Sequence, residues 1–80
     1  MSLEMELGKF TSAKDKLTGF YKEYIFDGEE VEKAEDEAVK SLYHIRNEDS
    51  RKLFEEDLKN LFEENGRGER FVELRERHKK

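Results

Sequence analysis

The segment from Asn47 to Gly66 constrains the fold more than any other part of the chain, because it holds a complete helix signature. Asn47 or Asp49 can cap its amino-terminal end, and Asn65-Gly66 is a typical carboxyl-terminal stop. Between these ends the apolar residues recur at spacings of three and four: Leu53, Phe54, Leu58, Leu61 and Phe62. That spacing predicts one apolar helix side, which other parts of the chain must cover.

Charged residues interrupt the predicted apolar stripes at three positions. Asp57 projects between Leu53 and Leu61, and Glu35 and Arg46 project into the stripe of the preceding helix. An unpaired buried charge is costly, so one interpretation is a polar contact among Glu35, Arg46 and Asp57 that fixes the helix register. The alternative is that these long side chains reach the rim of a narrow core and stay in water.

Two further long segments have helical periodicity. Residues 3–25 place their apolar positions on one arc, and we prefer a single helix there over a short strand at 3–7 followed by a helix from Ser12. Asp27-Gly28 is the expected stop and turn. Residues 29–46 form the second predicted helix, whose acidic first turn suits the helix dipole. Its apolar stripe is Val31, Ala34, Ala38, Val39, Leu42 and Ile45.

These segments predict an all-α fold, a small antiparallel helical bundle of three main helices plus a short C-terminal helix after Gly66. Only 34% of the residues are hydrophobic and 46% are charged, a composition that suits disorder when apolar residues are scattered. Here they fall in helical register, which favours a folded domain over residues 1–80. Because so short a chain buries a modest part of its surface, we expect a homodimer.

The sequence offers few residues for catalysis or metal binding. It has no cysteine, and neither of its two histidines has a second histidine within four residues or a nucleophile motif around it. Phosphate-binding and calcium-binding loop patterns are absent from the sequence. We therefore expect no catalytic residue, cofactor or metal. No apolar run approaches the roughly 20 residues of a membrane span, and no signal-peptide pattern opens the chain, so a cytoplasmic protein is expected.

The charge distribution divides the chain into an acidic body and a basic end. Residues 1–66 hold 10 Lys and Arg against 18 Asp and Glu, whereas residues 67–80 hold 6 against 3. The pattern predicts a non-enzymatic interaction or regulatory protein that presents acidic helices to a protein partner and contacts no membrane; a basic partner would complement the acidic charge. The residues expected to bind the partner are the aromatic side chains of Phe26, Tyr43 and Phe71 and the acidic side chains of Glu29, Glu30 and Asp36.

Two alternative functions remain open from the sequence. The basic end can contact nucleic-acid phosphates, as in a transcriptional regulator, through Arg67, Arg70, Arg75, Arg77, Lys79 and Lys80. Three glutamates interleaved among these cations count against that function. Alternatively, the acidic helices mimic nucleic-acid charge and inhibit a DNA-binding protein.

Overall fold

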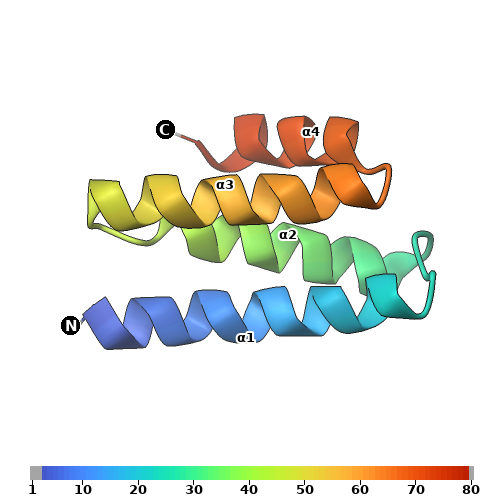
Figure 1. The fold of residues 1–80 in the computed structure, drawn as a ribbon, viewed down its shortest axis with the longest axis horizontal. Helices are drawn as coiled ribbons and strands as arrows, with labels where there is room; N and C mark the ends of the chain where they lie inside the picture. Colours follow the sequence, from blue (N-terminus) through green and yellow to red (C-terminus); the bar gives the residue numbers. More distant parts are fainter. Residues whose placement is uncertain (1–2, 80) are drawn as a thin grey trace.

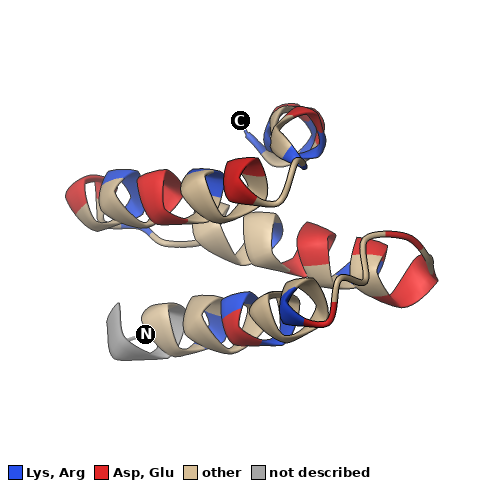
Figure 2. Ribbon diagram, turned by 45° about the vertical axis from the view of Figure 1, so that its right-hand side comes forward, with Lys and Arg blue, Asp and Glu red and all other residues tan. Residues whose placement is uncertain are grey.

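A computed structural model describes residues 3–79, with side chains from residue 7 onward. These residues form four helices and no strand: α1 (Leu3–Lys22), α2 (Glu29–Tyr43), α3 (Glu48–Glu64) and α4 (Gly68–His78). Successive helices reverse direction, and α2 packs against each of the other three (Figure 1). After rotation, α4 is seen nearly end-on while α1 and α3 are still seen from the side, so α4 crosses them (Figure 2). The predicted all-α bundle is confirmed.

Helix α1 is continuous through Thr11, so the alternative of an amino-terminal strand is wrong for residues 3–7. It ends at Lys22, earlier than the predicted Ile25. The stop is a Schellman motif, in which the Ile25 amide donates to the Phe20 carbonyl at 3.0 Å and the Tyr24 amide to the Tyr21 carbonyl at 3.0 Å. Tyr24 takes the left-handed position of this motif, at φ 59°.

Helix α2 begins at Glu29 as predicted and ends at Tyr43, three residues before the predicted Arg46. All six predicted stripe residues are buried, including Ile45 in the connection that follows. The main-chain amide of Ile45 donates to the Leu42 carbonyl at 3.1 Å, which closes the last turn. Arg46 is thereby carried beyond the helix end and is exposed.

Helix α3 has the ends that the sequence predicts. The Asn47 side chain accepts from the Ser50 amide at 2.9 Å, as a helix cap does. At the other end, a second Schellman motif joins the Arg67 amide to the Phe62 carbonyl at 2.7 Å, with Gly66 at φ 72°. Leu53, the first residue of the predicted apolar stripe, is not covered by the other helices, because it is 65% exposed.

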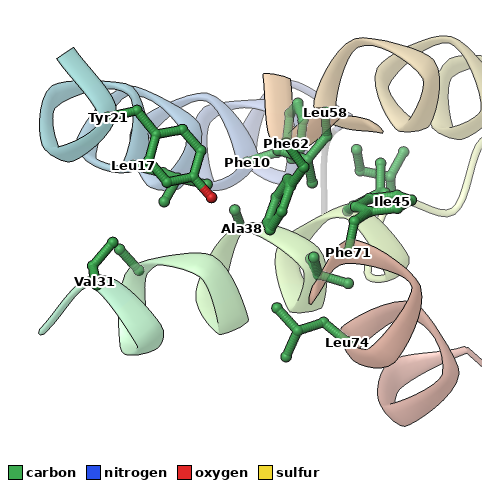
Figure 3. Packing of buried hydrophobic residues seen from close by; sticks show 13 residues of the cluster. Phe10, Leu17, Tyr21, Val31, Ala38, Ile45, Leu58, Phe62, Phe71 and Leu74 are labelled. Carbon is green, nitrogen blue, oxygen red and sulfur yellow. The ribbon is translucent and has the colours of Figure 1, made fainter. Parts of the chain in front are cut away.

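Aromatic side chains link the helices within the core. The Phe10 ring of α1 packs on the Phe54 ring of α3 at 5.3 Å, and Tyr21 meets Phe62 edge-on at 6.0 Å. Phe62 in turn packs on Phe71 of α4, also at 5.3 Å. Small and branched residues of α2 line the opposite side of this cluster (Figure 3). Replacing such a buried ring by alanine typically costs about 3–5 kcal/mol, so this chain of contacts is a main source of stability.

Candidate functional site

Among the residues with described side chains, Glu35 is the one charged residue that is fully buried. Helix α2 carries it on the same side as Ala34 and Ala38, whose small side chains let neighbouring helices approach closely. Both α1 and α4 pack against α2. The position demands partners for the carboxylate, because an isolated buried charge is expensive.

Glu35 receives those partners from two other parts of the chain. The Tyr21 hydroxyl of α1 donates to Oε2 at 2.6 Å. The Arg67 guanidinium, at the start of α4, donates from Nε to Oε2 and from Nη2 to Oε1, both at 2.9 Å. Arg70 Nε donates to Oε1 at 3.3 Å. We call Tyr21, Glu35, Arg67 and Arg70 the Glu35 cluster; its bidentate geometry is that of a strong charge-assisted pair.

The electrostatics of the Glu35 cluster indicate that it holds the helices together and is not a reactive group. Burial, followed by the hydrogen bond to Glu35, raises the pKa of Tyr21, so its hydroxyl remains a donor. The hydrogen bond to Glu35 raises the pKa of Arg67. Arg70 also donates to Glu73 at 2.8 Å, so two guanidinium groups face two carboxylates. This arrangement joins α1, α2 and α4 and leaves no unpaired acid or base within it.

The predicted contact among Glu35, Arg46 and Asp57 is wrong, although Glu35 is buried. Asp57 has a side chain 56% exposed and lies 3.8 Å from the Lys14 amine of α1. Arg46 lies past the end of α2 and is exposed. Asp57 is exposed because the buried strip of α3 is narrower than the periodicity implies, and Arg46 is exposed because α2 ends earlier than predicted.

The aromatic residues predicted to bind a partner are packed in the molecule to different degrees. Phe71 is 1% exposed and belongs to the core, so its prediction as an exposed residue is wrong. Phe26 is half-buried with its ring 5.5 Å from that of Tyr21. Tyr43 is half-buried and donates to the Glu55 carboxylate; burial and then this bond raise the pKa of Tyr43. The most exposed large hydrophobic residue in the described chain is Tyr24, at 83%.

The acidic residues predicted to bind a partner divide into exposed and internally bonded groups. Glu29 and Glu30 are exposed, and Glu29 makes only a surface pair with Lys33 at 3.5 Å. Asp36 is half-buried and lies 2.7 Å from His78 Nε2 and 3.3 Å from Arg77 Nη1. Burial raises the pKa of Asp36, but His78 and then Arg77 outweigh it and hold that pKa below its ordinary value.

The cations of the basic end are largely engaged with α2. Arg67 and Arg70 bind Glu35, and Arg77 binds Asp36. Arg75 is half-buried, and its Nε is buried without a hydrogen bond among the described residues. Lys79 is exposed, and Lys80 lies outside the described residues. The predicted nucleic-acid surface thus keeps few of its cations for an external ligand.

The described residues show neither a metal-binding group nor a membrane-spanning helix, and the chain matches no known protein. In the described part of the chain, no three His, Asp or Glu side chains are grouped so that they could hold a metal ion. No helix within residues 3–79 is long and apolar enough to cross a membrane. No family model, curated protein or solved structure matches this chain.

Proposed function

We propose that the chain is a non-enzymatic interaction protein that presents the corner between α1 and α2 to a basic protein partner. We call residues 23–30 the α1–α2 corner. They include four exposed carboxylates, on Glu23, Asp27, Glu29 and Glu30, and no Lys or Arg. The loop and the start of α2 are accordingly marked by acidic residues in Figure 2. Complementary charge steers such surfaces toward basic partners.

The observation that carries the proposal is the conformation and exposure of Tyr24. A left-handed backbone costs a residue with a side chain about 1–2 kcal/mol, and the equivalent position after α3 is filled by Gly66. Tyr24 nevertheless occupies it, and its side chain is 83% exposed in the segment that carries the four exposed carboxylates. Tyrosine is enriched among the residues that dominate binding energy at interfaces. A strained, exposed aromatic in an acidic corner fits partner binding better than it fits folding.

The two alternative functions fit these contacts less well. A nucleic-acid interface would need Arg67 and Arg70, which are committed to Glu35 inside the fold. A mimic of nucleic-acid charge would use the same corner carboxylates, but the exposed Tyr24 ring among them favours a mixed apolar and ionic protein interface. Titration with duplex DNA at two salt concentrations distinguishes nucleic-acid binding from the proposed function, because binding through phosphates weakens steeply as salt rises.

Replacing Tyr24 by glycine tests the proposal by separating binding from stability. Relief of the left-handed strain should raise the free energy of unfolding by about 1 kcal/mol. Loss of the aromatic ring should abolish binding of the partner protein. The measurement is affinity capture by the immobilised chain, read by mass spectrometry, beside thermal unfolding. Tyr24→Phe keeps the ring and should keep the partner. Glu29→Gln with Glu30→Gln should weaken capture, whereas the exposed Glu63→Gln with Glu64→Gln should not.

The outcome that contradicts the proposal is equal capture of the same proteins by the wild type and by Tyr24→Gly. Failure of the wild type to retain any protein at low salt also contradicts it.

The homodimer is proposed on separate grounds. Leu53 is 65% and Val72 48% exposed, and both are apolar side chains that the chain itself leaves uncovered. A second copy is one way to cover them. Light scattering at micromolar concentration should give twice the mass of the chain, and a monomer would contradict this proposal without affecting the α1–α2 corner.

A further inference from the structure

A second polar surface lies at the other end of α2 from the acidic corner. The ends of α2 and α4 and the first turn of α3 line a cavity of about 500 Å³ that is open to the surface. No carboxylate is among the side chains that line it: Lys40, Tyr43, His44, Arg51, Arg77, His78 and Lys79. Cavities of roughly 300–1,000 Å³ are the usual size of small-molecule sites. We call it the cationic cavity.

Most of the cations in this cavity have no acidic partner in the fold. In the described part of the chain, the side chains of Lys40 and Lys79 make neither a hydrogen bond nor an ion pair. The Arg51 side chain donates to the main-chain carbonyl of Ile45, at 3.5 Å, and makes no ion pair with the described residues. Of the lysines and arginines here, Arg77 alone pairs with a carboxylate, that of Asp36.

Nearby acids do not cancel this charge. Asp36 contacts Arg77 and His78, and Glu55 accepts from Tyr43. Even when both carboxylates are counted against the four lysines and arginines, two positive charges remain, with the histidines neutral. The excess lies on a chain whose formal net charge is -5.

A second cavity of the same molecule provides a comparison, because its lining carries equal numbers of acidic and basic side chains. It has about 580 Å³ and is lined by residues of α1, α2 and α4, with four carboxylates facing four lysines and arginines. Among these lining residues, Lys33 pairs with Glu29, and Arg77, which lines both cavities, pairs with Asp36. Helix dipoles favour basic residues at the ends of α2 and α4. They do not require cations from three helices to converge on one space without acids.

We propose that the cationic cavity binds a di- or triphosphate group, free or as part of a nucleotide. Lysine and arginine are the side chains that bind phosphates, as point charges and as planar forks respectively. Cations from three elements surround a space larger than one phosphate needs, so a chain of phosphoryl groups matches both the charge and the extent. This site is independent of the α1–α2 corner and of its proposed partner.

The test is calorimetric titration of the full chain with inorganic triphosphate at low ionic strength. Binding should saturate at one site and weaken as salt is raised. The Lys40→Gln, Lys79→Gln double variant should bind at least about tenfold more weakly, since charge-assisted contacts are lost. The matched control, Lys16→Gln with Lys33→Gln in the balanced cavity, should change affinity less than about twofold. All four lysines are exposed, and thermal unfolding verifies that each variant is folded.

Titrations with further ligands show which phosphate compounds bind, and they can contradict the proposed site. ATP should compete with inorganic triphosphate, and adenosine should not. The proposal is wrong when triphosphate fails to bind at low salt, or when the Lys40→Gln, Lys79→Gln variant binds it as tightly as the wild type. Binding of a single-stranded oligonucleotide that triphosphate cannot displace would also overturn it, in favour of an extended nucleic-acid surface.

Discussion

Glu35 and Asp57 are two carboxylates that fall within apolar helix stripes, and the fold treats them in opposite ways. Glu35 is fully buried and receives hydrogen bonds from a tyrosine and two arginines. Asp57 is more than half exposed, with one lysine amine at 3.8 Å. The difference shows that the position of a charged residue within an apolar stripe does not predict whether its side chain is buried. Burial depends on whether neighbouring elements bring partners to it.

The largest contrast is expected from replacing each carboxylate by alanine. Glu35→Ala leaves the Tyr21 hydroxyl buried without its acceptor and the Arg67 guanidinium without its carboxylate, so it should lower the free energy of unfolding by about 3–5 kcal/mol. Urea denaturation of Glu35→Ala and Asp57→Ala measures both. Equal stability of the two variants would show that the Glu35 cluster does not hold the fold.

A double-mutant cycle on Glu35 and Arg67 should show the next largest effect. The bidentate pair predicts a coupling energy of about 1–3 kcal/mol, because neither side chain is exposed enough for water to replace its partner fully. The same cycle on Asp57 and Lys14 should give no more than about 0.5 kcal/mol. Denaturation of the single and double variants supplies both values, and additive effects at Glu35 and Arg67 would refute the coupling.

Tyr21→Phe sharpens the comparison by removing one oxygen and keeping the ring in the core. The hydrogen bond to the Glu35 carboxylate should be worth about 1.5–3 kcal/mol, the range for bonds to charged groups. Tyr43→Phe is the half-buried control at the Glu55 contact, and it should cost less. Thermal unfolding that ranks the two variants in the reverse order would contradict the role given to Tyr21.

Asp36 is half-buried, between the buried Glu35 and the exposed Asp57, and the contribution of its ion pairs can be tested by varying pH. Its folded pKa lies below the unfolded value of about 3.9. Its pairs with His78 and Arg77 therefore contribute stability that is complete above about pH 5 and is lost as pH falls through the folded pKa. Asp36→Asn should reduce the fall in stability between about pH 5 and 3. An unchanged pH profile in that range would show that the pairs contribute nothing.

Asp57→Asn should have the smallest effect. The side chain is exposed and its lysine contact is long, so the free energy of unfolding should change by less than about 0.5 kcal/mol. A loss above about 1 kcal/mol would restore a buried role for Asp57.

Local sequence signals predicted the helices well, because each depends on residues near in the chain. Capping by Asn47, the Gly66 stop and the α2 stripe are set within a few residues. The sequence also marked Glu35 as anomalous. Its partners could not be identified, because pairing with Tyr21 and Arg67 depends on how α1 and α4 dock on α2. The three-residue spacing of Arg67 and Arg70 is the signal that could have pointed to a shared carboxylate.

Tyr24 was missed for a different reason. Nothing in the periodicity of residues 3–25 separates it from its apolar neighbours, and a tyrosine is not expected at the left-handed position of a helix stop. The sequence predicts the stop at Asp27-Gly28, since glycine commonly fills the left-handed position. The departure from a local rule is what makes Tyr24 informative.

The sequence separations within the Glu35 cluster determine the order in which the molecule can be assembled. Tyr21 lies 14 positions before Glu35, whereas Arg67 and Arg70 lie 32 and 35 positions after it. The α1–α2 hairpin can therefore bring Tyr21 to the carboxylate early, but the positive charge arrives only with the last helix. During synthesis on the ribosome, Glu35 has no guanidinium partner until residues 67–70 have left the exit tunnel. The charge-assisted bonds to the Glu35 carboxylate therefore form only once α4 has docked on α2.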